Sequence, residues 1–169
     1  MRFNLVDRIL AIESGRLIQA AKNLSLGEEY LADHFPGFPV MPGVLMLQTL
    51  AEAGAWLLRV TEDFQHSVVV LREAKNVKYG SFMEPGRQMV VTVEFVEQDG
   101  AFATFRGKGE VGGHPTVSAR LVLLRYNLRD RDAALASVDE QIIAHLRRQY
   151  AVIAGDALRE AAAHGCDAS

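Results

Sequence analysis

His34-Phe-Pro-Gly-Phe-Pro-Val-Met-Pro-Gly43 and the apolar stretch that follows it, from Val44 to Val60, decide the fold. Three prolines and two glycines in ten residues exclude a regular element, and the interleaved aromatic and apolar residues argue against a solvated linker. The prediction is a rigid loop that packs against the rest of the protein. A helix is predicted from about Val44 to Val60, with Pro42 near its first turn, where proline is tolerated.

The predicted helix is apolar on nearly every side, which predicts that it is buried all round. Its polar exceptions are Gln48, Glu52 and Arg59. Because these residues are four and seven positions apart, they share one narrow stripe of the helix surface.

The rest of residues 1–126 has the patterns of β-strands. Strands are predicted at 17–26, 67–79, 88–97, 101–111 and 116–126, with hairpins at Asp99-Gly100 and Gly112-Gly113, whereas residues 5–12 fit either a strand or a short helix. One face of 101–111 carries small residues at 101, 103, 107 and 109, which would let a helix approach closely. The expected α+β architecture is an antiparallel sheet of five or six strands around one buried helix, covered by a second layer or a partner subunit.

The C-terminal region changes in character after residue 126. Ser137-Val-Asp-Glu140 has the form of a capping box and predicts a helix with one apolar stripe, which could pack on its own domain or on a neighbouring subunit. We therefore expect a domain over 1–126 and a helical extension over 127–169.

The composition excludes several classes of protein. The chain has 169 residues, 49% of them hydrophobic and 23% charged, with a net charge of −3, which is globular and unsuited to bulk nucleic-acid binding. A single cysteine, Cys166, excludes an internal disulfide and a cysteine-built zinc site, and the histidines lack ligand-like spacing, so no metal or cofactor is predicted. With no targeting segment and no uninterrupted apolar run, a cytoplasmic protein without a membrane span is expected.

The string HFPGFPVMPGVLMLQTLAEAGA at 34–55 closely resembles the signature of the β-hydroxyacyl-ACP dehydratases of bacterial fatty acid synthesis, the FabZ type. The strings VDRILAIESGRLIQAAKNLS, NVKYGSFMEPGRQMVVTVEF and DGAFATFRGKGEVGG extend the resemblance over about residues 5–126. It implies a hot-dog fold and a homodimer, often a trimer of dimers, with an acyl tunnel along the dimer interface. Each site would be built from two chains, and the substrate would be carried on the phosphopantetheine arm of an acyl carrier protein (ACP).

The resemblance also assigns roles for the elimination of water, which needs a base, stabilisation of an enolate and an acid. By motif match His34 is the base, and histidine titrates near neutral pH. Gly43 lies where the family offers a backbone N–H to the thioester carbonyl, and a free N–H at a helix N-terminus suits a growing negative charge. Phe35, Phe38 and Met41 are expected either to line the tunnel or to pack the loop.

This sequence departs from the family at the acid. The family has Glu or Asp fourteen residues after the histidine, and here that residue is Gln48, whose amide can orient a water but cannot deliver a proton at pH 7. Glu52 lies one helical turn further on the same stripe. Burial would raise its pKa and favour the protonated form, whereas pairing with Lys or Arg would give it a structural role. The family usually also begins with a His-Arg-Tyr-Pro-like segment, and this sequence starts after it.

Four functions follow from these residues. The first choice is a (3R)-hydroxyacyl-ACP dehydratase, a hydro-lyase that gives the trans-2-enoyl thioester, with His34 as its base. The second is one subunit of a heterodimer whose partner carries the missing acid. The third is a hot-dog thioesterase, and the fourth is a non-catalytic protein that binds acyl-ACP or acyl-CoA.

Overall fold

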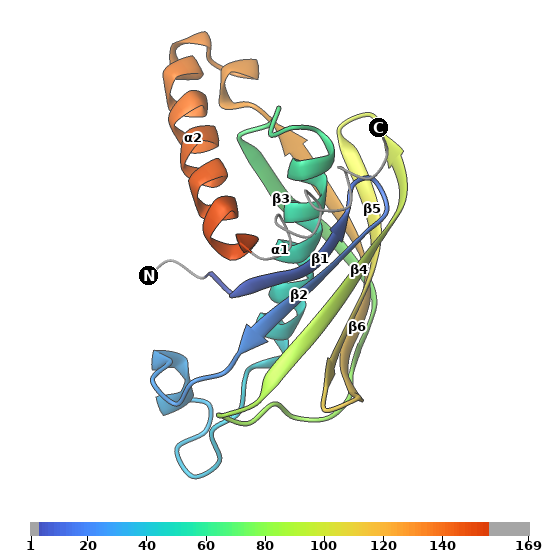
Figure 1. Cartoon of the computed structure of the whole chain (residues 1–169), viewed down its shortest axis with the longest axis vertical. Helices are drawn as coiled ribbons and strands as arrows, with labels where there is room; N and C mark the ends of the chain where they lie inside the picture. Colours follow the sequence, from blue (N-terminus) through green and yellow to red (C-terminus); the bar gives the residue numbers. More distant parts are fainter. Residues whose placement is uncertain (1–3, 156–169) are drawn as a thin grey trace, which may run out of the picture.

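The computed structural model describes residues 4–155 and contains one six-stranded antiparallel sheet, a central helix and a C-terminal helix (Figure 1). The strand order is β1-β2-β4-β5-β6-β3. The strands are β1 (Arg8–Glu13), β2 (Leu17–Asn23), β3 (Val68–Tyr79), β4 (Gln88–Asp99), β5 (Phe102–Val111) and β6 (His114–Tyr126). The helices are α1 (Gly43–Thr61) and α2 (Ala136–Ile153), with short 3-10 helices at Glu29–Ala32, Leu128–Asp130 and Ala133–Leu135.

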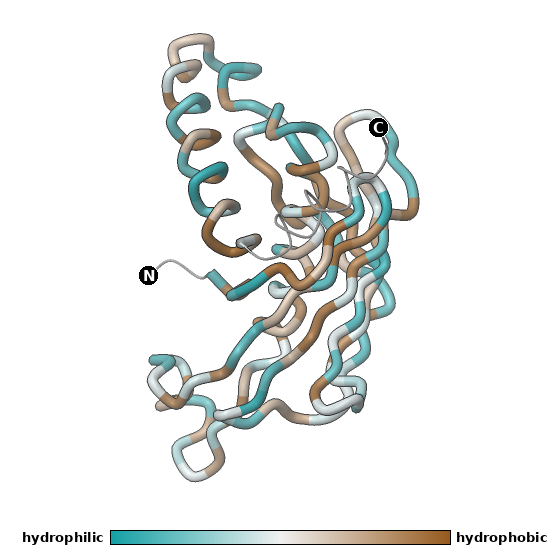
Figure 2. The backbone as a smooth tube through the Cα atoms, viewed as in Figure 1, coloured by the Kyte–Doolittle hydropathy of each residue, from teal (hydrophilic) through white to brown (hydrophobic). Residues whose placement is uncertain are grey.

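Alternation of side chains along the three central strands builds the face that covers α1. Met89, Val91 and Val93 are fully buried, and Phe105 pairs with Leu121 across β5 and β6 on the same buried layer. Figure 2 shows the resulting alternation of hydrophobic and hydrophilic residues along the strands. The α+β sheet-around-helix architecture and both hairpins are confirmed, and the ambiguous residues near the N-terminus form strand β1.

The predicted extension of β2 to residue 26 is wrong. β2 ends at Asn23 because the backbone of Leu24 turns to the loop before β4: its N–H donates to the carbonyl of Arg87, and its carbonyl accepts from the N–H of Gly86. A local sequence pattern carries no sign of these partners, which are distant in the chain.

Small residues let α1 approach the sheet closely, as the sequence predicts. Leu50 is fully buried, and a Cβ added to Gly107 of β5 would lie 3.2 Å from its Cδ1. The prediction that α1 is buried all round is wrong for its first turns. Val44 is 67% exposed and Gln48 is also exposed, because both residues stand at the mouths of cavities rather than under the sheet.

The predicted capping box at Ser137 is wrong, and its Asp139 has a different function. The helix follows directly from a 3-10 turn, so Leu135 occupies the N-cap position and Ser137 lies inside the first turn. Asp139 is fully buried, where it accepts hydrogen bonds from the Ser67 hydroxyl and from the N–H groups of Leu128 (2.9 Å) and Arg129 (3.0 Å). This carboxylate therefore fastens α2 to the start of β3 and the end of β6.

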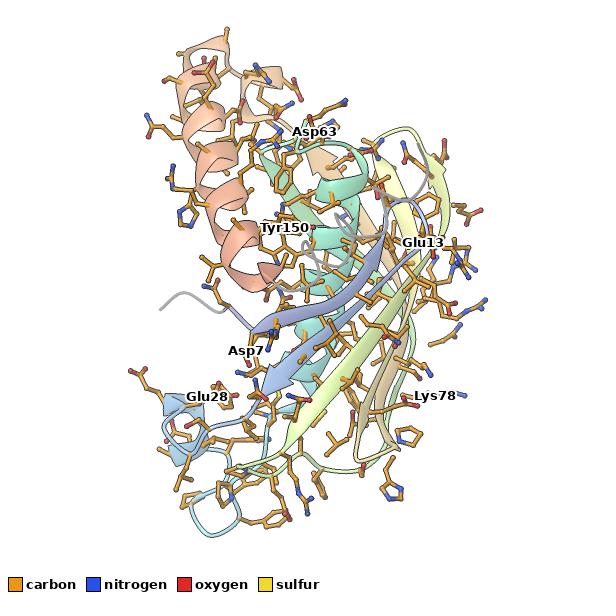
Figure 3. The ribbon with its side chains drawn as sticks, viewed as in Figure 1. Asp7, Glu13, Glu28, Asp63, Lys78 and Tyr150 are labelled. Carbon is orange, nitrogen blue, oxygen red and sulfur yellow. The ribbon has the colours of Figure 1, made fainter. Side chains whose placement is uncertain are left out.

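The apolar stripe of α2 packs on its own domain. Tyr150 projects from α2 toward α1 (Figure 3), with its ring centroid 6.2 Å from that of Trp56 and 5.7 Å from that of Phe64. Within residues 4–155, no helix has the length and apolar character needed to cross a membrane. Cys166, His164 and the end of the predicted extension lie outside the described residues.

Candidate active site

The loop that carries His34 is held by its own backbone. The N–H of His34 donates to the carbonyl of Tyr30, and the carbonyl of His34 accepts from the N–H of Val40 at 3.0 Å. Phe35 and Phe38 exchange a reciprocal pair of backbone hydrogen bonds, and the N–H of Met41 donates to the carbonyl of Met83. The peptide bond between His34 and Phe35 is cis. The loop is therefore a closed unit that fixes the backbone of His34 relative to the start of α1.

His34 and Gly43 meet in one cavity of about 320 Å³, named here the His34 cavity. Gly43 is the first residue of α1, and the first N–H groups of an α-helix have no partner within the helix. The other lining residues are Met41, Val44, Met46, Tyr79, Gly80, Ser81, Phe82 and Thr116. An imidazole thus shares one mostly apolar space with a helix N-terminus, the arrangement that stabilises negative charge on a bound oxygen.

Of the three apolar loop residues named from the sequence, only one lines the His34 cavity. Met41 is buried and lines the His34 cavity. Phe35 and Phe38 are 50% and 46% exposed and are not among its lining residues. The Phe35 ring stacks on His34, and the Phe38 ring meets Phe82 edge-on with centroids 5.7 Å apart.

The far wall of this cavity comes from β3 and β6, and no residue of either strand was predicted to belong to the site. Tyr79, Gly80 and Ser81 are at and just beyond the end of β3, and the backbone of Gly80 donates to the carbonyl of Thr116 at 2.8 Å. A Cβ on Gly43 would lie 2.9 Å from the Tyr79 ring, so glycine permits that close approach. The pairing of β3 with β6 brings these residues to His34. The available sequence signal was the resemblance of NVKYGSFMEP to the family's strand-turn-strand.

Gln48 and Glu52 line a different cavity of the same chain. This space of about 430 Å³, named here the α1–α2 cavity, lies between the two helices and β3. It contains the whole polar stripe that the sequence predicts, Gln48, Glu52 and Arg59, together with Trp56 and Gln149. A single chain therefore brings His34 together with Gly43 but not with Gln48 or Glu52.

Glu52 is held by the N-terminal segment. Its Oε2 accepts a hydrogen bond from the N–H of Leu5 at 2.8 Å. Burial raises the pKa of Glu52, although the N–H groups of Leu5 and Val6, the nearby Trp56 indole and the Arg59 charge act in the opposite direction. The net rise favours the protonated carboxylic acid.

Arg59 is the cation of the same cavity. Its guanidinium carbon lies 5.2 Å from the centroid of the Trp56 ring, and its Nε is buried without a hydrogen-bond partner. Burial lowers the pKa of Arg59 to about 10, against the raising effect of Glu52, so the side chain remains charged at neutral pH. Within residues 4–155, no carboxylate forms an ion pair with it.

Comparison with known proteins identifies the family. Residues 1–120 match the model of the FabA-like domain, which is more than half of the chain. The chain belongs to the FabA-like family. It is 39% identical over 123 residues to the 3-hydroxyacyl-[acyl-carrier-protein] dehydratase FabZ of Albidiferax ferrireducens, covering 70% of this chain and 81% of that protein. It is 35% identical over 120 residues to the FabZ of Geobacillus thermodenitrificans, covering 71% and 83%.

Solved structures confirm the hot-dog fold. The dehydratase heterocomplex ApeI:P from Xenorhabdus doucetiae matches with a TM-score of 0.61 at 16% identity, covering 78% of this chain and 89% of that chain. A hypothetical thioesterase from Streptococcus pneumoniae with coenzyme A matches with a TM-score of 0.52 at 11% identity, covering 71% and 85%. The FabA-like match ends inside β6, so α2 lies wholly beyond it.

Proposed function

We propose that the protein is a (3R)-hydroxyacyl-ACP dehydratase of type II fatty acid synthesis that acts in the cytoplasm. The observation that carries the proposal is the meeting of His34 and the N-terminus of α1 at Gly43 in one cavity. The FabZ relatives, with 35–39% identity over most of their length, support the same reaction.

The geometry of the His34 cavity suits the first half of the elimination. The His34 imidazole takes the proton from Cα while the Gly43 N–H, at the positive end of α1, binds the thioester oxygen as it gains charge. The electron pair of the broken Cα–H bond forms the Cα=Cβ bond, and the Cβ–O bond breaks. The hydroxyl oxygen must receive a proton to leave as water.

For this proton we assign Glu52, acting beside Gln48. Gln48 cannot donate an acidic proton, but its amide can orient the leaving hydroxyl or a water. Glu52 lies one turn away on the same stripe, and burial raises its pKa, which favours the protonated form that an acid needs. Glu52→Gln would then abolish turnover while leaving an acceptor for the Leu5 N–H.

The separation of the two cavities within one chain favours a site built from two protomers. β3 is at one edge of the sheet, and its Val70 is 44% exposed. The mouth of the His34 cavity adds exposed apolar side chains from Val44, Tyr79 and Phe82. Pairing of a second copy along this edge would cover these side chains and bring His34 of one protomer to Gln48 and Glu52 of the other. A trimer of such dimers is compatible with this arrangement.

Gln48 favours one alternative, a heterodimer in which a related partner chain supplies the acid. The dehydratase heterocomplex ApeI:P shares the fold of this chain. Thioesterase activity would release free thiol, and binding of acyl thioesters without turnover would give no product. The test therefore distinguishes both from dehydration.

The test uses the purified protein with a 3-hydroxyacyl-ACP and follows enoyl product and free thiol together. We expect enoyl formation that is lost in His34→Ala and retained in His114→Ala, a control at the exposed first residue of β6. Free thiol in place of enoyl product would indicate a thioesterase. An inactive wild type with an active Gln48→Glu variant would instead indicate the heterodimer.

Mixing two inactive variants tests the two-protomer site. In hybrid dimers of His34→Ala and Glu52→Gln chains, one of the two sites keeps both His34 and Glu52. Random exchange makes half of the dimers hybrid, so about a quarter of the wild-type activity should return. No recovery after verified subunit exchange would place the site within one chain.

A further inference from the structure

The lining of the α1–α2 cavity is apolar in part and polar in part. Beyond Gln48, the helix stripe presents the small residues Ala51 and Ala55 opposite the β3 residues Val69 and Leu71. Glu52 lies one helical turn from Gln48, and the other polar lining residues, Asn4, Arg59 and Gln149, form a wall beside the indole of Trp56. A cavity that received only a hydrocarbon chain would gain nothing from a charged wall.

Arg59 is the group in that wall with unused hydrogen-bonding capacity. Its Nε is buried without a partner, and no carboxylate of the described residues pairs with it. Glu52 is the acidic group that acts on Arg59, but one of its oxygens is bound by the Leu5 N–H. Because an unpaired buried donor is unfavourable, an oxygen acceptor that reached the Arg59 Nε–H would be bound strongly.

The position of Arg59 relates this wall to the reacting group. Eleven residues separate Gln48 from Arg59, which corresponds to about 16 Å along an α-helix at about 1.5 Å per residue. An acyl chain of about that length, with its reacting carbons at Gln48, would therefore reach Arg59 if it follows the stripe. Leu146 and Gln149 of α2 also line the cavity, and α2 lies beyond the FabA-like match.

We propose that the α1–α2 cavity receives the far end of the acyl chain, and that this end bears an oxygen, as a carboxylate or a carbonyl, bound by Arg59. The inference rests on the proposed function for the position of the reacting carbons. It adds a substrate class, since a chain that ends in a methyl group would leave the Arg59 Nε–H without a partner. Arg59 is thus a specificity-determining residue, and α2 is part of the substrate site.

The experiment uses the chain's only tryptophan as its reporter. Trp56 lines the α1–α2 cavity, so its fluorescence reports occupancy there without requiring turnover. The probes are three 3-hydroxyacyl-pantetheine thioesters of equal chain length that end in a methyl group, a methyl ester or a carboxylate. For each probe, the dissociation constant and the rate of enoyl formation are measured with the full-length wild type, Arg59→Met, Arg59→Lys and Arg147→Met.

Arg147→Met is the matched control. Arg147 also stacks on an aromatic ring, that of Phe64 at 4.7 Å, but it pairs with Asp63 and does not line the cavity. We expect the wild type and Arg147→Met to bind at least one oxygen-ended probe about tenfold or more tightly than the methyl-ended probe. Arg59→Met should lose this preference without weaker binding of the methyl-ended probe, and Arg59→Lys should retain part of it. A preference for the ester would identify a carbonyl end, and a preference for the carboxylate an acidic end.

The outcomes separate this inference from the proposed function. Equal or tighter binding of the methyl-ended probe by the wild type, or an unchanged preference in Arg59→Met, overturns the inference even if enoyl product forms. A preference that depends on Arg59 but is accompanied by no enoyl product from any probe upholds the selectivity of the cavity and refutes dehydration. Thermal unfolding of each variant distinguishes loss of binding from loss of fold.

Discussion

Two glycines line the His34 cavity, and a methyl group added to each meets a different kind of neighbour. At Gly80, the new Cβ would lie 2.2 Å from the carbonyl oxygen of Pro115, which is backbone of the paired strand β6. At Gly43, it would lie 2.9 Å from the Tyr79 ring, a side chain that is 52% exposed in the single chain. The first contact can be relieved only by separating two strands, and the second by moving one ring.

For Gly80→Ala we expect a large loss of stability. Carbon and oxygen in contact lie about 3.3–3.6 Å apart, so the strand ends must part by about 1 Å. That movement breaks the hydrogen bonds from Gly80 to Thr116 (2.8 Å) and from Ser81 to Pro115 (3.2 Å). Each contributes about 0.5–1.5 kcal/mol, and overpacking adds about 1–3 kcal/mol. The free energy of unfolding should therefore fall by about 4 kcal/mol.

Gly43→Ala should leave stability within about 1 kcal/mol of wild type, because the Tyr79 ring can move. The moved ring reshapes the wall opposite His34, and misplacement by about 1 Å can lower a rate by about 100-fold. We therefore expect kcat/KM to fall by about 10–100-fold. Urea unfolding followed by Trp56 fluorescence measures stability, and enoyl formation measures activity. Gly37→Ala is the control, since a Cβ there meets nothing within 4 Å.

Two results would refute this reasoning. A stability loss below about 1 kcal/mol in Gly80→Ala would mean that the turn after β3 relaxes without breaking its pairing. Full activity in Gly43→Ala would mean that the position of the Tyr79 ring does not shape the site.

Three further variants test the groups that support the two cavities. Burial raises the pKa of Glu52 above its ordinary value of 4.5, so the folded protein binds this proton more tightly than the unfolded chain, and stability falls as pH rises through that value. In chemical unfolding, Glu52→Gln should gain stability relative to wild type between about pH 4 and pH 7, and a constant difference would contradict the burial effect. Burial alone would raise the pKa of Asp139, but hydrogen bonds from Ser67, Arg129 and Leu128 prevail and lower it below 3.8. This carboxylate therefore stabilises the fold above that pH and loses its contribution as pH falls further, so Asp139→Asn should be less stable at neutral pH and approach wild type in acid. Leu50→Ala should lose about 3–5 kcal/mol in urea unfolding, because Leu50 is fully buried against Gly107, and a loss under about 1 kcal/mol would show that the helix collapses onto the sheet.

Features that depend on near neighbours in the chain could be predicted from the sequence. The alternation of Met89, Val91 and Val93 identifies a strand because successive side chains point to opposite faces. The proximity of His34 and Gly43 follows from a short loop that turns directly into a helix. The stripe from Gln48 to Arg59 follows from helical spacing, and the structure places its members in one cavity.

Features that depend on distant partners could not be predicted. Asp139 has the position of a capping residue, but its partner Ser67 is 72 residues away, and the competition between the two roles is decided by burial. Tyr79 and Thr116 reach the His34 cavity only because β3 pairs with β6, a register that no local pattern specifies. The separation of His34 from Gln48 could be expected only from the family resemblance. Their spacing in the chain would by itself suggest that the two residues lie close together, because both are near the start of the same helix.

The packing of α1 restricts where this fold can change its substrate. On one face of the helix, Leu50 meets Gly107, and a Cβ on Gly54 would lie 3.3 Å from a methyl of Leu123, so larger residues there would force the helix off the sheet. On the stripe from Gln48 to Arg59, side chains border the α1–α2 cavity and can change in size or charge without disturbing that contact. The α2 residues that cover the stripe can change in the same way, because they take no part in the contact between α1 and the sheet. Selection of a new acyl group would therefore act on the stripe and on α2, whereas His34 and Gly43 are fixed by the loop that joins the sheet to the helix.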